Sequence, residues 1–427
     1  MSRLTWLRHL GASLLAAALL VFAAAPPAAT QTTTGTIRGY VHDSSGAPFG
    51  GAMVEAKNLA TGGLRTSTSN ADGSYVLAGL VPAVYDLTVR HIGSAPSTRR
   101  VVVQIGSTTL ADFIPTAQAV EVAGVNIQAA APAFDLKTSE VATNISAQQM
   151  QQLPTQSRNF LDFAQLAPGV QVTEDIITVG NGVTSRTVSA GGGSPNQTNV
   201  FIDGASLKND LTGGGIAGQD ASRGNPFPQN AIQEYRVITQ NFKAEYQQAG
   251  TAVINATTKS GTNEWHGTAQ FQYSDKGLFA LDSFQIALKS PKPDFSRALP
   301  SLSIGGPLMR DKLFVFASYE GNYQDRANLI NFNPISGFAA LDSVNLKQYN
   351  GLFTSPFRES LLFGRLDYNA GEHSAVQLSW SQRIEHDIRD FGTDNFGNGT
   401  AYDNAVNLKN TDGIGNLKYT YATGPWL

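Results

Sequence analysis

The segment WHGTAQFQYS, residues Trp265–Ser274, alternates aromatic or small side chains with polar ones at every second position. Successive residues of a β-strand point to opposite faces, so this pattern predicts a strand with one apolar and one polar face. Similar alternation recurs along the rest of the chain, giving about six such strands in all. The further strand-like runs are SLSIGG, LFVFASYEGNY, LLFGRLDYN, AVQLSWS and GNLKYTY.

The connections between these strands alternate in length. PLMRDK and AGEHS are short, whereas the links around residues 275–299, 324–358 and 383–412 are long. Outer-membrane barrels have short turns at one end, long loops at the other and an apolar outer face. We therefore expect the apolar face of these strands to meet lipid and the polar face to line a wet lumen. A soluble β-domain is the alternative, but nothing in such a domain requires unequal ends.

The composition is typical of a mainly β protein. Of the 427 residues 15% are charged, 42 are glycine and none is cysteine. The lack of cysteine excludes disulfides, zinc–thiolate sites and a thiol nucleophile in this sequence. The net charge of -3 supplies no basic field, so no nucleic-acid partner is expected. Beyond the N-terminus no apolar run reaches the roughly 18 residues of a membrane-spanning helix.

Residues 1–30 have the pattern of a secretory signal peptide. Arg3 and Arg8 form a basic start, LGASLLAAALLVFAAA is apolar, and small residues follow at positions 28–30. An N-terminal membrane anchor is the alternative, but the apolar run is short and ends in Pro26-Pro27. We expect an exported chain whose mature part starts near Gln31.

Residues 31–116 predict a small β-sandwich. Strand-like TIRGYVHD, MVEAKN, GSYVLAGL, VYDLTVRH and RRVVVQI are separated by SSGAP, ATGG and NADG. Asp72-Gly73 is expected to form a hairpin turn. The segment resembles the carboxypeptidase regulatory-like domain of the carbohydrate-binding-like superfamily, which implies an immunoglobulin-like or prealbumin-like sandwich. The matching positions are Gly39, Asp43, Gly46, Pro48, Gly51, Ala52, Asp72, Gly73, Tyr75, Leu80, Pro82 and Tyr85, whereas Ala83-Val84 departs from the pattern.

The next two segments predict a linker and an α/β domain. Residues 117–137 are rich in alanine and contain Pro132, and their VEVAGVNI stretch can add as a strand to a partner's sheet edge. In residues 138–261, QQMQQLP and SRNFLDFAQLAPGV predict two short helices, broken at Pro154 and ended by Pro168-Gly169. Strand-like TVSAG, TNVFIDGAS, IQEYRVITQNF and TAVINATTKSG follow.

The run NAIQEYRVITQNFKAEYQQAGTAVINATTKSGTNEWHGTAQF resembles the end of the plug and the first barrel strand of TonB-dependent outer-membrane receptors, especially the Oar-like branch. SRNFLDFAQLAPGV, NVFIDGASLKND and SIGGPLMRDKLFVFASYEG extend the resemblance in the same order. It implies a plug at 138–261 and the first strands of an incomplete transmembrane antiparallel β-barrel at 262–427. Because plugged outer-membrane transporters have 22 strands, it also implies that this chain is the N-terminal part of a longer protein.

The resemblance also implies functional residues. The linker is expected to carry the TonB-contacting segment Glu121, Val122, Ala123, Gly124 and Val125, and the plug motif includes Asp203, Gly204, Glu234, Tyr235, Glu245 and Tyr246. Phe279, Phe284 and Phe295 in a long loop are candidates either for ligand contact or for packing the loop. The charged plug residues Arg158, Asp203, Glu234, Arg236 and Glu245 are expected to form structural pairs rather than a transport relay.

Other motifs give no support for catalysis. LTGGGIAGQ contains G-x-G-x-x-G, but no buried strand precedes it and no amphipathic helix follows. Asn70 and Asp72 favour a plain turn over a calcium loop, and the six histidines lack the close spacing of a metal site. We therefore expect no enzyme activity, catalytic residue, metal or cofactor.

The leading hypothesis is a TonB-dependent receptor that binds an external ligand and moves it across the outer membrane through a plugged barrel. Its expected partners are outer-membrane lipid, a TonB-type energy-transducing protein and a siderophore, oligosaccharide or peptide, with the N-terminal sandwich in the periplasm. The alternative is a secreted or surface carbohydrate-binding or adhesin-type β-protein without transport. Fold alone does not decide the ligand.

Overall fold

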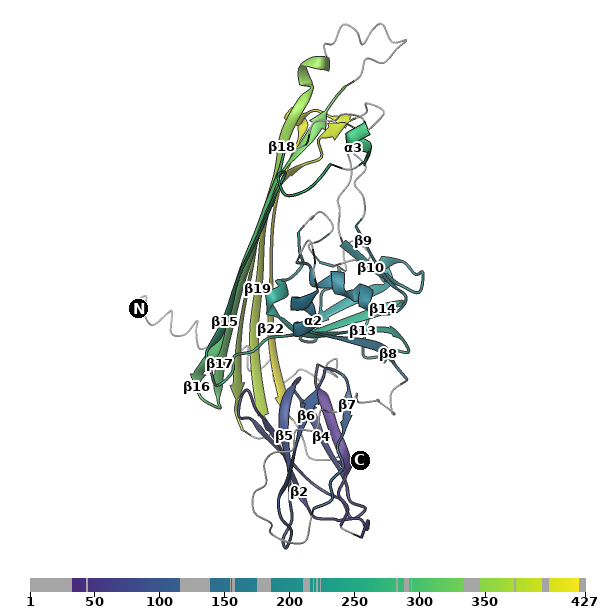
Figure 1. Cartoon of the computed structure of the whole chain (residues 1–427), viewed down its shortest axis with the longest axis vertical. Coiled ribbons are helices and arrows are strands. Elements are labelled where there is room, and N and C mark those ends of the chain that lie inside the picture. Colours follow the sequence, from purple (N-terminus) through teal and green to yellow (C-terminus); the bar gives the residue numbers. More distant parts are fainter. Residues whose placement is uncertain are drawn as a thin grey trace, which may run out of the picture. The chain divides into compact units, whose positions relative to one another are not determined.

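The computed structural model of the chain is mainly β, as the sequence predicts (Figure 1). No helix among the described residues has the length and hydropathy to cross a membrane. The structure describes residues 33–421 except 44, 116–138, 154, 156–157, 175–185, 210–215, 218, 220–221, 223, 282, 288–291, 293, 333–345, 372–373 and 394–398.

The N-terminal sandwich packs two small antiparallel-rich sheets face to face, with strand orders β4-β1-β7 and β3-β2-β5-β6. In β5 the side chains of Tyr85, Leu87 and Val89 are buried while their neighbours are not, because alternate residues of a strand face the core. The strands are β1 (Gly35–Tyr40), β2 (Met53–Asn58), β3 (Leu64–Thr68), β4 (Ser74–Leu80), β5 (Ala83–Arg90), β6 (Ser97–Val103) and β7 (Thr108–Leu110).

The expectation of a hairpin at Asp72-Gly73 is wrong. The turn joins β3 to β4, which belong to different sheets, so the chain crosses from one layer of the sandwich to the other. Gly73 has a φ of 78° and its amide donates to the Asn70 carbonyl at 2.9 Å. Glycine suits this left-handed conformation, which other residues adopt at a cost.

The middle domain is built on a five-stranded sheet of order β12-β11-β14-β13-β8, with a separate hairpin of β9 and β10. Its core contains Ile145, Phe160, Tyr235 and Ile254. Its elements are β8 (Val141–Ser146), α2 (Ala147–Gln152), η1 (Phe160–Leu166), β9 (Val170–Glu174), β10 (Arg186–Ala190), η2 (Pro195–Gln197), β11 (Thr198–Ile202), β12 (Ala205–Ser206), η3 (Gln229–Ala231), β13 (Ile232–Gln240) and β14 (Ala252–Thr258).

The two expected helices of this domain differ in kind. Ser146 and Gln149 form a capping box at the start of α2, which satisfies free amides at the helix N-terminus. The second is a 3-10 helix rather than an α-helix. It ends at Leu166, and the C-cap residue Ala167 is extended with ψ 133° because Pro168 follows and disfavours the helical conformation before it.

The third region is a single antiparallel sheet of six long strands in the order β15-β16-β17-β18-β19-β22, which run side by side in Figure 1. Short turns follow β16 and β18, and long connections follow β15, β17 and β19. The strands are β15 (His266–Asp275), β16 (Phe295–Met309), β17 (Leu313–Ile330), β18 (Gly351–Asn369), β19 (Ser374–Arg389) and β22 (Val406–Tyr421). Smaller elements in the long connections are α3 (Ser283–Ala287), η4 (Leu346–Tyr349), β20 (Gly392–Thr393), β21 (Gly399–Thr400) and η5 (Tyr402–Asn404).

The long connections are shorter than the sequence pattern suggested, and this expectation is corrected. Residues 295–299, 324–330, 351–358, 383–389 and 406–412 belong to strands rather than loops. There the strands continue past the end of the clean polar–apolar alternation, so hydrogen-bonded pairing persists where the side-chain pattern no longer signals it.

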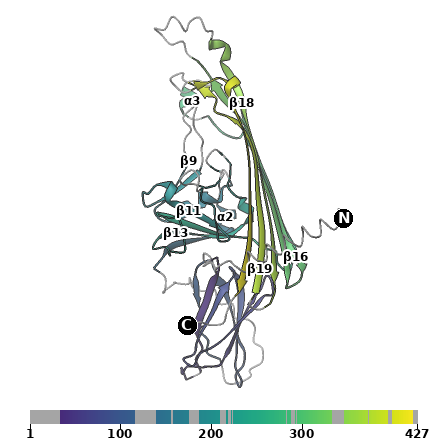
Figure 2. The same cartoon turned by 180° about the vertical axis from the view of Figure 1, so that it is seen from behind.

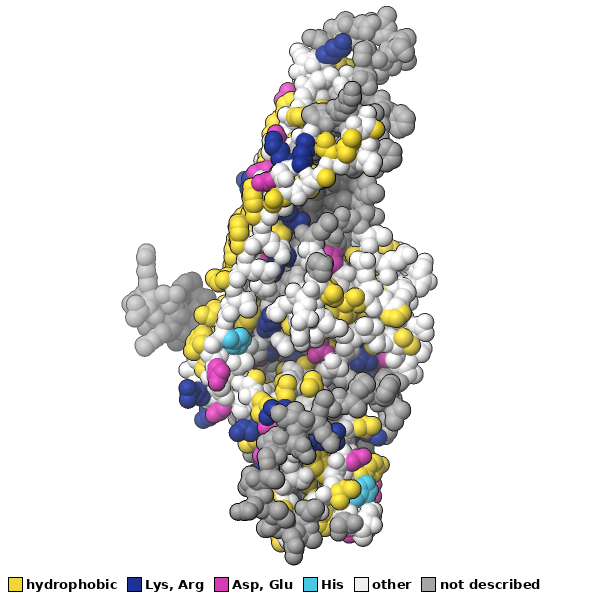
Figure 3. Space-filling view, in the orientation of Figure 1, with side chains coloured by type: hydrophobic (Ala, Val, Ile, Leu, Met, Phe, Trp, Pro, Cys, Tyr) yellow, Lys and Arg dark blue, Asp and Glu magenta, His cyan; other side chains and the backbone are white. Residues whose placement is uncertain are grey.

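The six-stranded sheet exposes its apolar face. Leu302, Leu378 and Trp380 are 48–55% exposed, whereas the intervening Ser301, Ser303 and Ser379 are 4–7% exposed. Hydrophobic side chains line the outer border of the tall sheet in Figure 3. The polar face is covered by the middle domain, seen from behind in Figure 2. We call this six-stranded sheet the wall, and its polar side the inner face.

Candidate functional site

The inner face of the wall carries buried charges at positions where strands of a soluble sheet place core residues. Glu320, Glu359, Arg365, Arg383 and Glu385 are each 1–6% exposed. Burial of a charge is costly unless it is paired and hydrogen-bonded. Each of these groups meets a side chain or a backbone amide of the middle domain or the wall, in three clusters.

The first cluster surrounds Arg158, a non-glycine residue at φ 53° just before η1. Its guanidinium donates to Glu320 on β17 at 3.0 Å and to Asn230 at 2.9 Å. The Asn230 amide donates to the same carboxylate at 2.6 Å, and Gln270 on β15 accepts a further bond from Arg158. One arginine thus fixes the middle domain to two strands of the wall.

The second cluster centres on Arg365 of β18. Its guanidinium donates to the Thr258 carbonyl at 2.9 Å, lies 3.6 Å from Asp203, and forms a bidentate pair with Asp367 at 2.7–3.0 Å. Asp203 also accepts from Gln377 of β19 at 2.9 Å. This aspartate sits in the tight turn between β11 and β12, where its φ is 52°.

The third cluster joins the segment before β13 to β18 and β19. Arg383 donates to Ser222 at 3.1 Å, and the Ser222 hydroxyl donates to Glu385. The Asn225 amide donates to Glu359 at 2.9 Å. Gly224 leaves room for that carboxylate, because a Cβ on it would lie 1.9 Å from the Glu359 oxygen.

The interface combines these charge clusters with an apolar contact, in which Phe227 packs against Phe363 of β18 at 5.2 Å between ring centroids. An ion pair buried at a junction is costly to break one partner at a time, but its groups regain full hydrogen bonding when both partners return to water. An interface built from such pairs therefore holds one docked position and still permits the whole domain to leave. A large apolar interface of the same area resists separation much more strongly.

The plug-motif residues of the sequence have different surroundings. Asp203 and Gly204 form the β11–β12 turn of the Arg365 cluster, and Gly204 has a φ of 90°. Tyr235 packs against Phe160 at 5.9 Å between ring centroids, and burial raises the pKa of its hydroxyl.

Glu234 lies on the opposite side of β13 from Tyr235 and belongs to a separate cluster with the sandwich. Tyr246 packs against Phe201 at 5.8 Å, and burial raises the pKa of its hydroxyl to about 12. Glu245 is half-buried beside it.

Of the candidate linker and loop residues, the structure describes only those of the loop. Glu121, Val122, Ala123, Gly124 and Val125 lie outside the described residues. Phe279 and Phe295 pack edge to face at 5.7 Å, with the Lys292 ammonium 4.9 Å above the Phe279 ring. Phe284 lies in α3.

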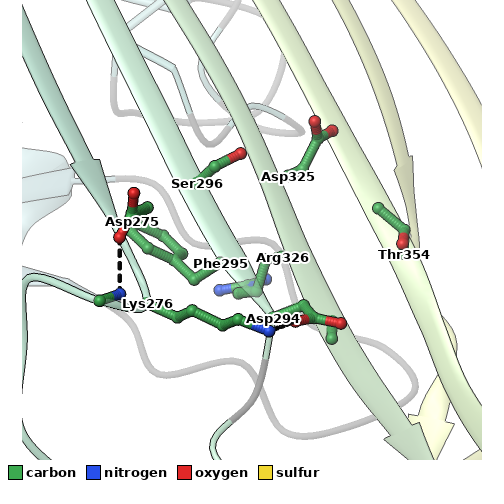
Figure 4. A pocket seen from close by; sticks show the side chains of 10 residues that line it. Asp275, Lys276, Asp294, Phe295, Ser296, Asp325, Arg326 and Thr354 are labelled. Atoms are coloured by element: carbon green, nitrogen blue, oxygen red, sulfur yellow. Dashed lines mark hydrogen bonds and ion pairs between the residues drawn. The ribbon is translucent and has the colours of Figure 1, made fainter.

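A pocket of about 450 Å³ opens at the long-loop end of the wall (Figure 4). Asp275, Phe295 and Asp325 line it together with Lys276, Asp294, Ser296, Arg326 and Thr354. Asp325 is held by a bidentate pair with Arg358 at 2.7 and 2.9 Å. The lining of the pocket combines charged side chains with one aromatic ring, a mixture suited to a polar ligand.

Sequence reasoning missed the wall partners of the plug charges. Glu320 and Arg365 were expected only as polar positions of alternating strands, and Arg383 was expected in a long connection. A charged residue at an inward position in the middle of a strand was the signal that could have found them, because a buried charge needs a partner of opposite charge. Among the described residues, no group of three or more His, Cys, Asp or Glu is placed to hold a metal ion.

Three domain models match the chain in succession. They are the carboxypeptidase regulatory-like domain at residues 36–115, the TonB-dependent receptor plug domain at 135–254 and an outer membrane β-barrel domain at 257–336. Two curated relatives also match the chain. The TonB-dependent transporter Oar of Myxococcus xanthus is 25% identical over 307 residues, which cover 67% of this chain and 27% of the relative.

The second relative is a probable TonB-dependent siderophore receptor PirA of Acinetobacter baumannii, 26% identical over 59% of this chain and 30% of its own. The chain thus spans less than a third of the length of either relative. Among solved structures, the outer membrane transporter YddB from Escherichia coli aligns with a TM-score of 0.45 and 16% identity, covering 58% of this chain and 33% of that one. The plug-type middle domain, the regulatory-like sandwich before it and the barrel strands after it place this chain in the family of TonB-dependent outer-membrane receptors.

Proposed function

We propose that the protein binds an external ligand at the long-loop end of the wall and the plug, and transports it across the outer membrane when a TonB-type protein pulls the linker at 117–137. The proposal rests on the plug–wall interface. Its buried charge clusters hold the plug in one position, yet every broken pair can be solvated when the plug moves. The pocket of about 450 Å³ beside Asp325 is a candidate ligand contact.

The proposal places the sandwich in the periplasm and the apolar face of the wall in lipid. The contact of the sandwich with the short-turn end of the wall and the outward apolar band support both positions. A siderophore, an oligosaccharide and a peptide are the ligand classes to be tried, since the plug and wall do not distinguish among them. The adhesin alternative gains no support from the three domain models.

Uptake in cells tests this function directly. We would measure entry of three radiolabelled probes, a ferric catecholate siderophore, a malto-oligosaccharide and a tripeptide, in cells that express the receptor. We expect one probe to enter, and its entry to stop when Glu121–Val125 is deleted or TonB is absent. Uptake that continues at full rate without the linker segment contradicts the proposal.

A binding experiment isolates the energy-transducing partner. A peptide spanning residues 117–137 should bind the periplasmic domain of a TonB-type protein by adding a strand to its sheet edge. A peptide with Val122 and Val125 changed to proline is the matched control, because proline cannot donate the strand hydrogen bonds. Equal binding of both peptides excludes the strand-addition contact.

A further inference from the structure

The sandwich touches the plug through the turn between β6 and β7. The Ile105 amide donates to Glu234 of β13 at 3.3 Å, and the Ile105 carbonyl accepts from Arg236 of β13 at 3.4 Å. Ile105 is completely buried. Gly106 beside it has a φ of 64°, and a Cβ there would lie 3.3 Å from the Arg236 side chain, so the turn is closely fitted to the plug.

The same contact includes β8, the first plug strand after the linker. Asn144 of β8 lies directly opposite Arg236 in the register of β8 and β13, and its amide donates to Glu234 at 3.0 Å and to the Ile105 carbonyl at 3.4 Å. Glu140, just before β8, pairs with Arg236 at 3.1 Å. We call these contacts of Ile105 with Glu234, Arg236 and Asn144, supported by Glu140, the plug anchor.

The plug anchor lies on one face of a two-sided sheet. Tyr235, Val237 and Ile145 point into the plug core, whereas Glu234, Arg236 and Asn144 lie at the alternate positions. Burial raises the pKa of Glu234 to about 7, and the hydrogen bonds from Ile105 and Asn144 oppose that shift. The sandwich thus covers the part of this face that carries Glu234, Arg236 and Asn144, whereas Ile238 on the same face belongs to a separate apolar cluster of the plug.

The sandwich also contacts the short-turn end of the wall. The Asn263 amide donates to the Ala60 carbonyl at 2.8 Å, and Lys418 of β22 donates to Thr33. Asn263 is itself tied to Asp311, in the turn after β16, by two bonds of 2.7 and 2.8 Å. We call this second contact the wall anchor.

A cavity of about 780 Å³ lies beside the wall anchor. Sandwich residues such as Asn58 and Val84 form one side, and Asp203, Arg365 and Lys418 form the other. The sandwich therefore covers the side of the plug–wall interface where the Arg365 cluster lies.

From this arrangement we propose that the sandwich is a clasp that joins the plug to the wall, and that tension on the linker opens it at the plug anchor. The inference rests on the proposed function, in which the linker is pulled. A pull at residues 117–137 reaches Glu140 first and then separates β8 from β13 from the Val141 end. That separation removes Glu140 from Arg236 and Asn144 from both Glu234 and Ile105. The bonds of Ile105 to Glu234 and Arg236 are then all that remains of the plug anchor; at 3.3 and 3.4 Å they are too weak to hold the sandwich, which leaves the plug in the same event while the wall anchor retains it.

Energy transfer between two labels on the receptor in nanodiscs tests the clasp. The sequence has no cysteine, so Ile92→Cys on the sandwich and Lys243→Cys on the plug give two unique, exposed labels. A mechanical tether inserted in the linker applies the load, so the result does not depend on TonB or on a ligand. We expect high transfer at zero load and a drop in the same step in which β8 leaves the plug.

Variants at the plug anchor separate docking from folding. Glu234→Ala and Asn144→Ala should lower the docked population at zero load at least about tenfold, because each leaves buried polar groups unpaired. Glu234→Gln keeps an acceptor and should stay docked, and Glu264→Gln, an exposed carboxylate outside the anchor, should behave as the parent protein. Gly106→Ala weakens docking from the sandwich side and leaves every plug residue unchanged.

Unchanged transfer in Glu234→Ala and Gly106→Ala overturns the clasp, as does a sandwich that stays docked after β8 has left. If the labels show the expected docking and opening but cells that express the receptor take up none of the probes, the clasp stands and the proposed transport is wrong.

Discussion

The sandwich and the wall are both made of alternating strands, but they bury opposite faces. In the sandwich, Val54 and Leu87 are inaccessible while Met53 and Val102 are about half exposed. In the wall, Leu378 is 48% exposed while the neighbouring Ser379 is 7% exposed. Water sets the first arrangement through the hydrophobic effect. The second is stable only where the outer face meets something as apolar as itself, which in this family is lipid.

The inner side of the two regions differs accordingly. The sandwich core is a continuous cluster of apolar side chains, whose contacts do not depend on bond direction as hydrogen bonds do. The inner face of the wall holds Arg365, Arg383 and Glu320, whose hydrogen bonds fix the plug in register. The sandwich thus gains stability from apolar packing, whereas the charges of the wall fix one docked position of the plug.

The largest difference between the regions should appear when a charge is placed on a buried apolar position. Leu87→Asp puts an unpaired carboxylate in the sandwich core and should cost more than about 5 kcal/mol, enough to unfold a small domain. Val102→Asp, on the exposed side of the neighbouring strand β6, should cost less than about 1 kcal/mol. Urea unfolding followed by circular dichroism measures both, and equal midpoints contradict the described sandwich core.

The charged inner face predicts the next effect. Arg365→Met leaves the buried Asp203 and the partly buried Asp367 without their counter-charge and should destabilise plug docking by about 3–5 kcal/mol. Arg358→Met is the matched control, since its pair with Asp325 is about 40% exposed and should be worth about 0–1 kcal/mol. Protease accessibility of the plug against temperature compares the two, and a larger effect for Arg358 refutes the ranking.

A substitution on the outer face of the wall tests whether that face meets lipid or water. Leu378→Arg should cost about 2–4 kcal/mol in a bilayer if position 378 lies near its midplane. Leu378→Met, a near-isosteric apolar change, should cost less than about 1.5 kcal/mol. Folding free energies in lipid vesicles give both values. A neutral Leu378→Arg would show an outer face that meets water, as the exposed face of the sandwich does.

The plug anchor predicts a smaller, pH-dependent effect. Burial raises the pKa of Glu234 from 4.5 to about 7, so the folded state holds its proton more tightly than the unfolded state. Stability is therefore highest below the unfolded pKa and is lost as pH rises through about 7, by at most about 3 kcal/mol. Glu234→Gln should remove the part of this dependence that Glu234 contributes. Unfolding midpoints at pH 5 and 8 for both proteins test the sign, and a parent protein that is more stable at pH 8 contradicts it.

Alternation predicted the wall well because lipid and plug demand opposite side chains on its two faces. The six strands and the unequal connections follow from that demand. The alternation fails to predict the strands where their two faces no longer need opposite side chains. Beyond Tyr323, β17 continues through Gln324, Asp325 and Arg326, whose polar side chains on both faces look like a loop.

The sandwich strands that escaped prediction have a similar reason. β3 is LRTST, with little apolar content, and β7 has only three residues, so neither shows a period. The long-range pairs are beyond local pattern altogether. Arg158 and Glu320 are separated by 162 positions, and their contact depends on the docking of one domain on another.

Site-directed spin labelling tests the inverted wall most directly. Single cysteines at the outward positions 302, 366, 378 and 417 and at the inward positions 301, 303, 318 and 379 would carry a nitroxide in the receptor reconstituted into vesicles. We predict that oxygen, which concentrates in lipid, relaxes the outward labels, and that a polar nickel reagent does not reach them, while the plug shields the inward labels from both. Outward labels that the nickel reagent relaxes as strongly as those on the exposed face of the sandwich would contradict this prediction.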